Sequence, residues 1–125
     1  MYNVLLVALG GGIGAALRHL SGVAALRLLG PAFPYGTMFV NVLGSFVMGV
    51  FIELLARRFG ASPELRLFFA TGVLGGFTTF SSFSLDTAFL YERGDLALAA
   101  VYVIGSVAVG IAALFAGLAL VRAIA

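Results

Sequence analysis

The segment GVLGGFTTFSSFS, residues 72–84, lies inside a long apolar stretch, and its composition raises the first structural question about this chain. Two adjacent glycines, Gly75 and Gly76, are followed by hydroxyl-bearing residues interleaved with phenylalanines. Glycine is a poor helix former, so this pair is expected to weaken or break a membrane helix at mid-span. A break frees backbone groups that protein, water or ions must satisfy, because lipid cannot. Thr78 and Thr79 would then cap the second half-helix.

The composition places the whole chain in a membrane. Of 125 residues, 62% are hydrophobic and 10% are charged, against about 25% charged residues in soluble domains. A spanning helix needs roughly 20 apolar residues. Four such helices and short loops fill the chain, so we predict one all-α domain over residues 1–125, with spans over residues 3–29, 36–59, 64–91 and 95–122.

Several classes of function are disfavoured. The chain has no cysteine, a single histidine (His19) and no lysine, and its seven arginines form no run. Disulfides, thiolate metal sites and a nucleic-acid footprint are therefore not expected. The GGGIG segment lacks the preceding strand that a dinucleotide-binding fold requires. No nucleophile–base pair is apparent, so the sequence does not predict an enzyme.

The distribution of arginines between the two sides gives little preference for one orientation in the membrane. Four spans put both termini and the second loop on one side, with four arginines there against two or three on the other. This is a weak positive-inside bias. It suits a protein that inserts in both orientations, although a short chain can also show a weak bias by chance.

Polar residues recur at helical spacing on three spans. Thr37, Asn41, Ser45 and Met48 follow one stripe of the second span, and Tyr102 and Ser106 lie four apart on the fourth. Such residues can simply bridge helices. No acidic residue lies near the centre of a span, however, where a proton-coupled carrier or cation pore would carry one. Mostly uncharged polar stripes on three helices therefore favour a permeation path.

The third span adds aromatic residues to this path. Phe80, Phe83 and Ser84 share one helix face. A phenylalanine ring has a positive edge, so ring edges and hydroxyl donors together suit a small anion. Ordinary packing is the alternative for the two rings. Arg18, within the first span, either snorkels to an interface or lines an aqueous vestibule.

Three motifs together resemble the Fluc (CrcB) family of fluoride channels. These are GGIGAALR from Gly11 to Arg18, GTMFVNVLGSFVMG from Gly36 to Gly49, and GVLGGFTTFSSFS from Gly72 to Ser84. The resemblance covers all four spans in length and order. It implies a bacterial channel of the inner membrane that exports fluoride passively and forms an antiparallel, dual-topology homodimer. Two pores would lie at the subunit interface.

The resemblance also implies roles for individual residues. A structural sodium ion at the dimer centre would be held by the carbonyl groups of Gly75 and Thr78. Arg18 would lie near a vestibule. The remaining matched positions would form the fluoride path: Thr37, Asn41, Phe80, Ser81, Ser82, Phe83, Ser84, Tyr102 and Ser106.

The chain departs from the family pattern at His19, at Ser82, where many members have threonine, and at Gly110, where some have a hydroxyl. At Gly110 this chain therefore lacks the hydroxyl group that forms the outer end of the polar track in some members. Two other classes of membrane protein are alternatives. A dual-topology multidrug carrier also has four short spans, but it relies on a first-span glutamate, and no acid precedes Glu53 here. A non-transporting assembly subunit would explain the small-residue faces but not the phenylalanine and hydroxyl stripe.

Overall fold

A computed structural model describes residues 1–124 and is helical throughout, apart from short turns and one internal break. Four helical segments are long and apolar enough to cross a membrane: Tyr2–Leu29, Tyr35–Arg58, Pro63–Glu92 and Leu96–Ile124. The first, second and fourth are the continuous helices α1, α2 and α6. The predicted spans are confirmed to within two residues at each end. The chain is thus a multi-pass membrane protein.

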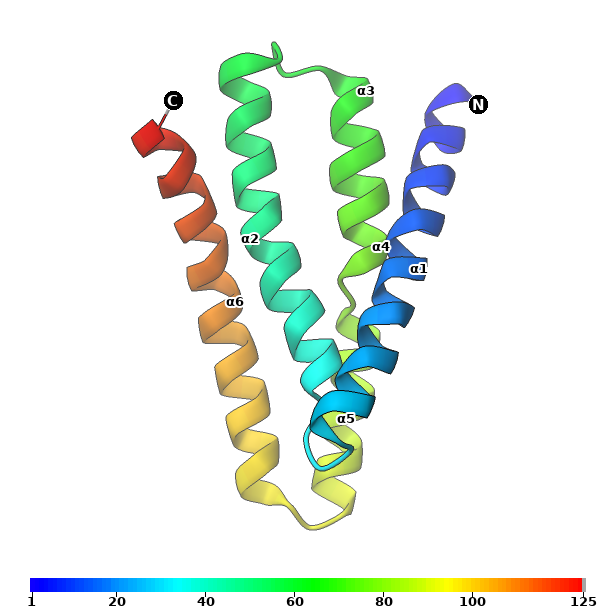
Figure 1. Ribbon diagram of the computed structural model, residues 1–125, viewed down its shortest axis with the longest axis vertical. Helices are drawn as coiled ribbons and strands as arrows, with labels where there is room; N and C mark the ends of the chain where they lie inside the picture. The colour runs from blue at the N-terminus through cyan, green and yellow to red at the C-terminus, as the bar shows by residue number, and fades with distance from the viewer. Residues whose placement is uncertain (125) are drawn as a thin grey trace.

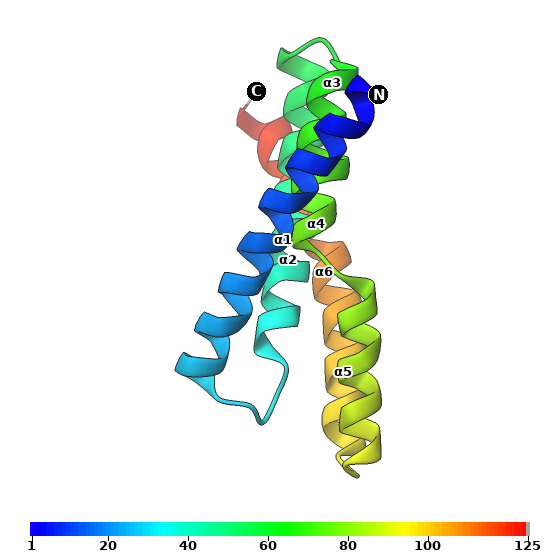
Figure 2. The ribbon, with the colours of Figure 1, turned by 90° about the vertical axis from the view of Figure 1, so that its right-hand side faces the viewer.

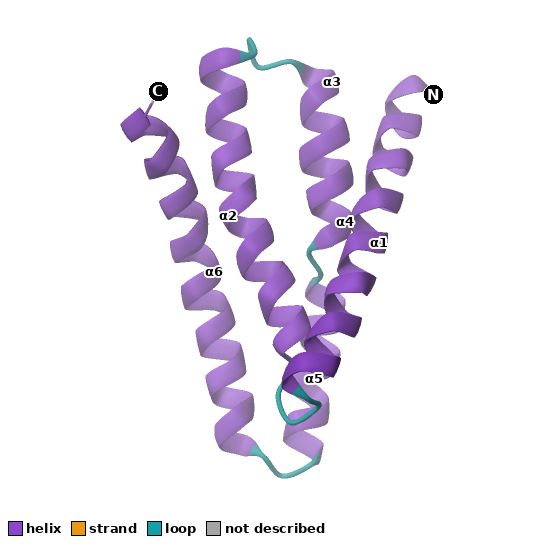
Figure 3. Cartoon of the chain, in the orientation of Figure 1, coloured by secondary structure: helices purple, strands orange, loops and turns teal. Residues whose placement is uncertain are grey.

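The third segment is assembled from several pieces. It consists of α3 (Pro63–Leu65), the π-helix η1 (Arg66–Leu74), α4 (Gly75–Phe77) and α5 (Phe80–Glu92). Ser62 caps its start, because the amide of Leu65 donates to the Ser62 hydroxyl. The teal gap in Figure 3 marks where the helix is interrupted.

The break was predicted at the wrong residues. Gly75 and Gly76 are helical, and the chain becomes extended at Thr78 (φ −88°, ψ 158°) and Thr79 (φ −154°, ψ 118°). The reason is packing: a Cβ atom at Gly76 would lie 2.5 Å from the carbonyl oxygen of Gly11. The glycine therefore serves a close helix contact, and the chain leaves the helix only after that contact.

The helices form two tightly packed pairs. Helix α2 packs mainly on α6, and α1 packs mainly on η1 and α4. Figure 1 shows both termini and the α2–α3 turn at one end of the molecule, as predicted for four spans. Figure 2 shows that, towards the opposite end, α1 and α2 diverge from α5 and α6. The break in the third segment lies where this divergence begins.

Glycines set the distance between the paired helices. Gly10 and Gly14 of α1 are buried, and a Cβ atom on either would overlap a backbone carbonyl group of η1, that of Phe68 or Val73. Gly117 of α6 approaches the backbone of α2 in the same way. Small residues therefore allow the helix backbones to approach closely at these positions. Gly12 is different, since nothing lies within 4 Å of the position that its Cβ atom would take.

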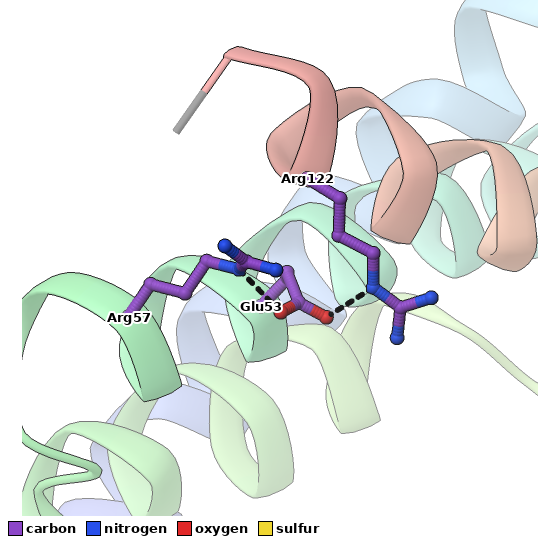
Figure 4. A network of polar contacts seen from close by, with 3 residues as sticks. All are labelled: Glu53, Arg57 and Arg122. Carbon is purple, nitrogen blue, oxygen red and sulfur yellow. Dashed lines mark hydrogen bonds and ion pairs between the residues drawn. The ribbon is translucent and has the colours of Figure 1, made fainter.

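Charged side chains join helices at the two ends of the bundle. Figure 4 shows Glu53 of α2 between Arg57, one turn on, and Arg122 of α6. The two N–O distances are 2.8 and 3.0 Å. At the other end, Arg93 pairs with Asp95 and donates to the carbonyl oxygen of Ala32. Gly30 ends α1 in a left-handed conformation (φ 81°) that favours glycine.

Candidate functional site

The two threonines at the break face opposite half-helices. The hydroxyl of Thr78 donates back to the carbonyl oxygen of Leu74 at 2.9 Å, in the half-helix before the break. The hydroxyl of Thr79 accepts from the amide of Ser82 at 3.1 Å and so caps α5. The prediction that both threonines cap the second half-helix is therefore right for Thr79 and wrong for Thr78. A hydroxyl on each side stabilises a helix end that would otherwise be left without partners.

Asn41 of α2 binds the main chain of the break at two points. Its Oδ1 atom accepts from the amide of Thr79 at 2.7 Å, and its Nδ2 atom donates to the carbonyl oxygen of the same residue at 3.0 Å. The hydroxyl of Ser45 donates to the carbonyl oxygen of Asn41 at 2.7 Å. An asparagine amide has two N–H donors, and one N–H of Asn41 has no acceptor within residues 1–124.

Arg18 of α1 reaches the break from the other side. Its Nε donates to the carbonyl oxygen of Gly76 at 3.0 Å, and the residue is partly buried. A cation is favoured at the C-terminal end of a helix, which is where Gly76 lies. Snorkelling to an interface therefore does not fully describe Arg18, because its guanidinium group is hydrogen-bonded to the end of a half-helix.

The break leaves main-chain oxygen atoms that could hold a small cation. In a continuous helix the carbonyl group of Gly75 would accept from Thr79, whose amide donates to Asn41 instead. No hydrogen bond to the Thr78 carbonyl group forms within residues 1–124. Among the same residues, no group of three acidic, histidine or cysteine side chains could hold a metal. The backbone oxygens of Gly75 and Thr78 therefore fit a hard cation such as sodium, which prefers oxygen ligands.

The two phenylalanines of the third segment lie side by side. The ring centroids of Phe80 and Phe83 are 5.6 Å apart with planes at 43°. Phe83 also packs on Tyr102 of α6 at 5.1 Å. Phe80 is 78% exposed in a single copy of the chain. The two rings are thus neighbours on one helix face, but Phe83 is packed against α6 whereas Phe80 projects from the surface.

A cavity of about 310 Å³ brings many of the predicted residues together. We call it the α2–α5–α6 cavity. Its lining contains no charged side chain, and the hydroxyl oxygen of Ser106 is buried there without a partner among residues 1–124. The lining residues are Asn41, Gly44, Ser45, Met48, Thr78, Thr79, Phe80, Phe83, Ser106, Val107 and Leu114.

Other predicted residues lie outside this cavity. Thr37 and Ser82 line a second cavity of about 320 Å³ with Arg18 and His19, between α1, α2 and α5. We call it the Arg18 cavity. Ser81 and Ser84 are exposed; the Ser84 hydroxyl donates to the carbonyl oxygen of Phe80. The structure therefore divides the predicted polar path between two sides of α5.

Tyr102 has a partner that the sequence did not suggest. The residue is fully buried, and its hydroxyl donates to the carboxylate of Asp86 at 3.1 Å. The two residues lie on different helices, 16 positions apart, so no helical spacing connects them. Thr79 was also missed as a site residue, although it was expected to cap the second half-helix.

This geometry can hold a small anion without trapping it. The α2–α5–α6 cavity offers the remaining amide N–H of Asn41, the hydroxyl of Ser106 and two aromatic rings, with no fixed charge. Weak, multiple and uncharged contacts permit an ion to enter and to leave. No reacting group or catalytic pair lines the cavity.

Comparisons with known proteins agree on one family. Residues 5–118 match the family model described as CrcB-like protein, Camphor Resistance (CrcB). The chain is 61% identical over 122 residues to a protein of Agrobacterium fabrum, and the match covers 98% of each chain. It is 61% identical over 120 residues to one of Rhodopseudomonas palustris, covering 96% of this chain and 97% of the relative. A protein of Chelativorans sp. is 60% identical over 124 residues, with 99% of each chain covered. All three relatives are named fluoride-specific ion channel FluC.

Proposed function

Because this chain belongs to the CrcB family, we propose that it is a fluoride-selective channel that lets the ion leave the cytoplasm down its electrochemical gradient. The family consists of ion channels, and the chain is not an enzyme. The relatives are bacterial, which supports placement in the inner membrane of a bacterium. Lowering of cytoplasmic fluoride would follow from the outward gradient.

The observation that carries this proposal is the uncharged, donor-bearing lining of the α2–α5–α6 cavity. Ser106 has a buried hydroxyl with no partner among residues 1–124, and Asn41 has one free N–H. A buried polar group without a partner is costly, so these donors are expected to face water or an ion. The edges of Phe80 and Phe83 add weakly positive surface beside them. Fluoride is small enough to exchange its hydration for such contacts, whereas a larger halide would be excluded from a narrow path.

We assign the other predicted residues to the approaches of this path. Arg18 and the hydroxyl groups of Thr37 and Ser82 line the Arg18 cavity, which suits a vestibule. Ser81 and Ser84 lie on the exposed side of α5, next to Phe80.

A second copy of the chain would complete the pore. Phe80 is 78% exposed, and the neighbouring Gly75, Ser81 and Ser84 are exposed as well. A ring and a set of polar groups on one face, next to an open cavity, favour a partner that covers them. We propose an antiparallel, dual-topology homodimer with two pores at its interface. The weak charge bias of the loops supports this arrangement.

A sodium ion at the dimer centre fits the same face. The carbonyl groups of Gly75 and Thr78 would hold it, because neither accepts a hydrogen bond within residues 1–124. A bound cation would add positive potential near both pores and would tie the two copies together.

The decisive experiment is fluoride efflux from liposomes that contain the purified protein, read with a fluoride electrode. The wild type should release fluoride rapidly and leave chloride inside. Phe80→Leu should lose the fluoride flux. Phe115→Leu is the matched control, because Phe115 is also exposed, at 62%, but lies on α6 outside every cavity described above. A folded wild-type protein that releases no fluoride would refute the proposed function.

Dual topology has its own test. The chain has no cysteine, so Ala61→Cys in the exposed α2–α3 turn provides a single label site. A membrane-impermeant maleimide should label about half of the protein in intact cells if both orientations are equally populated. Complete labelling, or none, would instead indicate a single orientation.

A further inference from the structure

The carbonyl groups at the helix break fall into two kinds, those that accept a side-chain hydrogen bond and those that accept none. Those of Gly76 and Thr79 each accept a side-chain hydrogen bond at 3.0 Å, from Arg18 Nε and Asn41 Nδ2 respectively. The carbonyl group of Gly75 has lost its helical partner, and that of Thr78 receives no donor within residues 1–124. Of the five carbonyl groups from Gly75 to Thr79, those of Gly76 and Thr79 are thus bound, whereas those of Gly75, Phe77 and Thr78 receive no donor within residues 1–124.

We propose that Arg18 and Asn41 are positioning residues that clamp the break from two helices and so decide which carbonyl groups remain for a cation. By occupying the oxygens of Gly76 and Thr79, they leave those of Gly75, Phe77 and Thr78, and the cation site proposed above uses the first and the last of these. This inference rests on the proposed function, and it gives Arg18 and Asn41 a task distinct from contact with fluoride.

The position of Arg18 favours a clamp over a freely hydrated charge. The guanidinium group is partly buried, and its Nε atom is committed to the oxygen of Gly76, 58 residues away in the sequence. A cation at the C-terminal end of a half-helix is stabilised by the helix dipole. The same positive charge disfavours a metal ion at Gly76, because like charges repel. Arg18 thus stabilises the helix end and also prevents the carbonyl oxygen of Gly76 from binding the cation.

The position of Asn41 links the clamp to the aromatic pair. Its amide binds both the N–H and the carbonyl group of Thr79 and therefore fixes the orientation of that residue. Thr79 is the N-cap of α5, so its orientation sets the direction in which α5 leaves the break. Phe80, the first residue of α5, follows directly. A loosened clamp is therefore expected to disturb the cation oxygens and the ring of Phe80 together.

Two substitutions of Arg18 separate the hydrogen bond from the charge. Glutamine places an N–H donor the same number of bonds from the main chain as arginine Nε, but carries no charge. Leucine carries neither donor nor charge. Arg27 makes no hydrogen bond or ion pair within residues 1–124, and it lies nine positions further on in α1, so the same two substitutions there are matched controls.

Two readouts apply that do not depend on fluoride flux. One is hydrogen–deuterium exchange of the segment 75–84 with sodium replaced by N-methylglucamine. The other is the sodium concentration that gives half of the maximal thermal stabilisation. We expect Arg18→Leu to speed the exchange and to raise this concentration by about ten-fold or more, as for loss of a charge-assisted hydrogen bond. Arg18→Gln should stay near the wild type in both, as should both Arg27 variants.

Asn41→Asp tests the second half of the clamp. The aspartate keeps an acceptor for the amide of Thr79 but sets an oxygen against its carbonyl group. We expect faster exchange and weaker stabilisation by sodium, as for Arg18→Leu. If this variant does not fold, the comparison of Arg18→Gln with Arg18→Leu is the test of the clamp.

The outcomes that overturn the inference are distinct from failure of the channel proposal. Equal behaviour of Arg18→Leu and the wild type would show that the bond to Gly76 positions nothing. Equal losses in Arg18→Gln and Arg18→Leu would show that the charge matters and the hydrogen bond does not. Either result can occur in a protein that conducts fluoride. Conversely, absence of wild-type fluoride efflux refutes the channel whatever the exchange rates are.

Discussion

The hydroxyl of Tyr102 on α6 donates a hydrogen bond to the carboxylate of Asp86 on α5, across 3.1 Å. The tyrosine is fully buried, and its ring packs edge-on against Phe33 at 5.5 Å and beside Phe83 at 5.1 Å. A hydroxyl has a single proton, which here is committed to the carboxylate. Tyr102 therefore supports the aromatic pair from behind, while the donors of Asn41 and Ser106 face the α2–α5–α6 cavity.

Tyr102→Phe tests this pairing. The substitution keeps the ring but leaves a carboxylate within the membrane span without its donor. We expect a loss of about 1–3 kcal/mol in unfolding free energy, measured by denaturant titration in detergent micelles. Fluoride efflux should fall much less than in Phe80→Leu, because the aromatic packing is retained.

Asp86→Asn completes a double-mutant cycle with Tyr102→Phe. The two losses should overlap, with a coupling of about 0.5–3 kcal/mol. Strictly additive losses would mean that the hydrogen bond contributes nothing to stability.

Gly14→Ala tests the close contact between α1 and η1. The added methyl group would overlap the carbonyl oxygen of Val73 and lie 2.8 Å from the amide nitrogen of Phe77. The backbone cannot move aside as a flexible side chain can, so the free energy of unfolding should fall by about 1–3 kcal/mol. Thermal unfolding in detergent measures it.

Gly12→Ala is the matched control in the same helix. Its new Cβ atom meets nothing within 4 Å. Alanine is a better helix former than glycine, by about 1 kcal/mol, so this variant should be as stable as the wild type or more so. Equal destabilisation by the two substitutions would contradict the packing described for Gly14.

Thr79→Ala tests the cap at the start of α5. The substitution removes the acceptor for the amide of Ser82. Loss of an N-cap typically costs about 1 kcal/mol, and Thr79→Ser should restore most of it. Thr71→Ala serves as the control, since Thr71 is exposed in η1 and makes no side-chain hydrogen bond within residues 1–124. If Thr79→Ser behaves like Thr79→Ala, the hydroxyl is not acting as a cap.

Glu53→Gln tests the ion pairs between α2 and α6. The neutral amide should lower the midpoint of thermal unfolding, because both Arg57 and Arg122 lose their partner. The arginine side chains are about half exposed, so added salt should narrow the gap between variant and wild type. Glu92→Gln is the control, because Glu92 is exposed and forms no ion pair or side-chain hydrogen bond within residues 1–124. An unfolding gap that is insensitive to salt would indicate that the effect is not electrostatic.

Local sequence was sufficient to predict the spans and their order. Apolar runs of the right length act over a few turns of chain, and the structure confirms the spans that they predict. The stripe containing Asn41 and Ser45 and the neighbouring rings of Phe80 and Phe83 were also predictable, because helical spacing sets them. The family motifs added the expected roles of these residues.

What the sequence alone did not decide depends on contacts between distant helices. The same glycine pair could break a helix or permit close packing, and the approach of α1 selects packing at Gly76 and moves the break to Thr78 and Thr79. Likewise, only tertiary structure brings Arg18 to Gly76, Asn41 to Thr79 and Tyr102 to Asp86. The sequence determined where helices form, since that follows from local apolar length and caps. The tertiary structure decided which backbone groups are bound and which remain free, because those partners come from other helices.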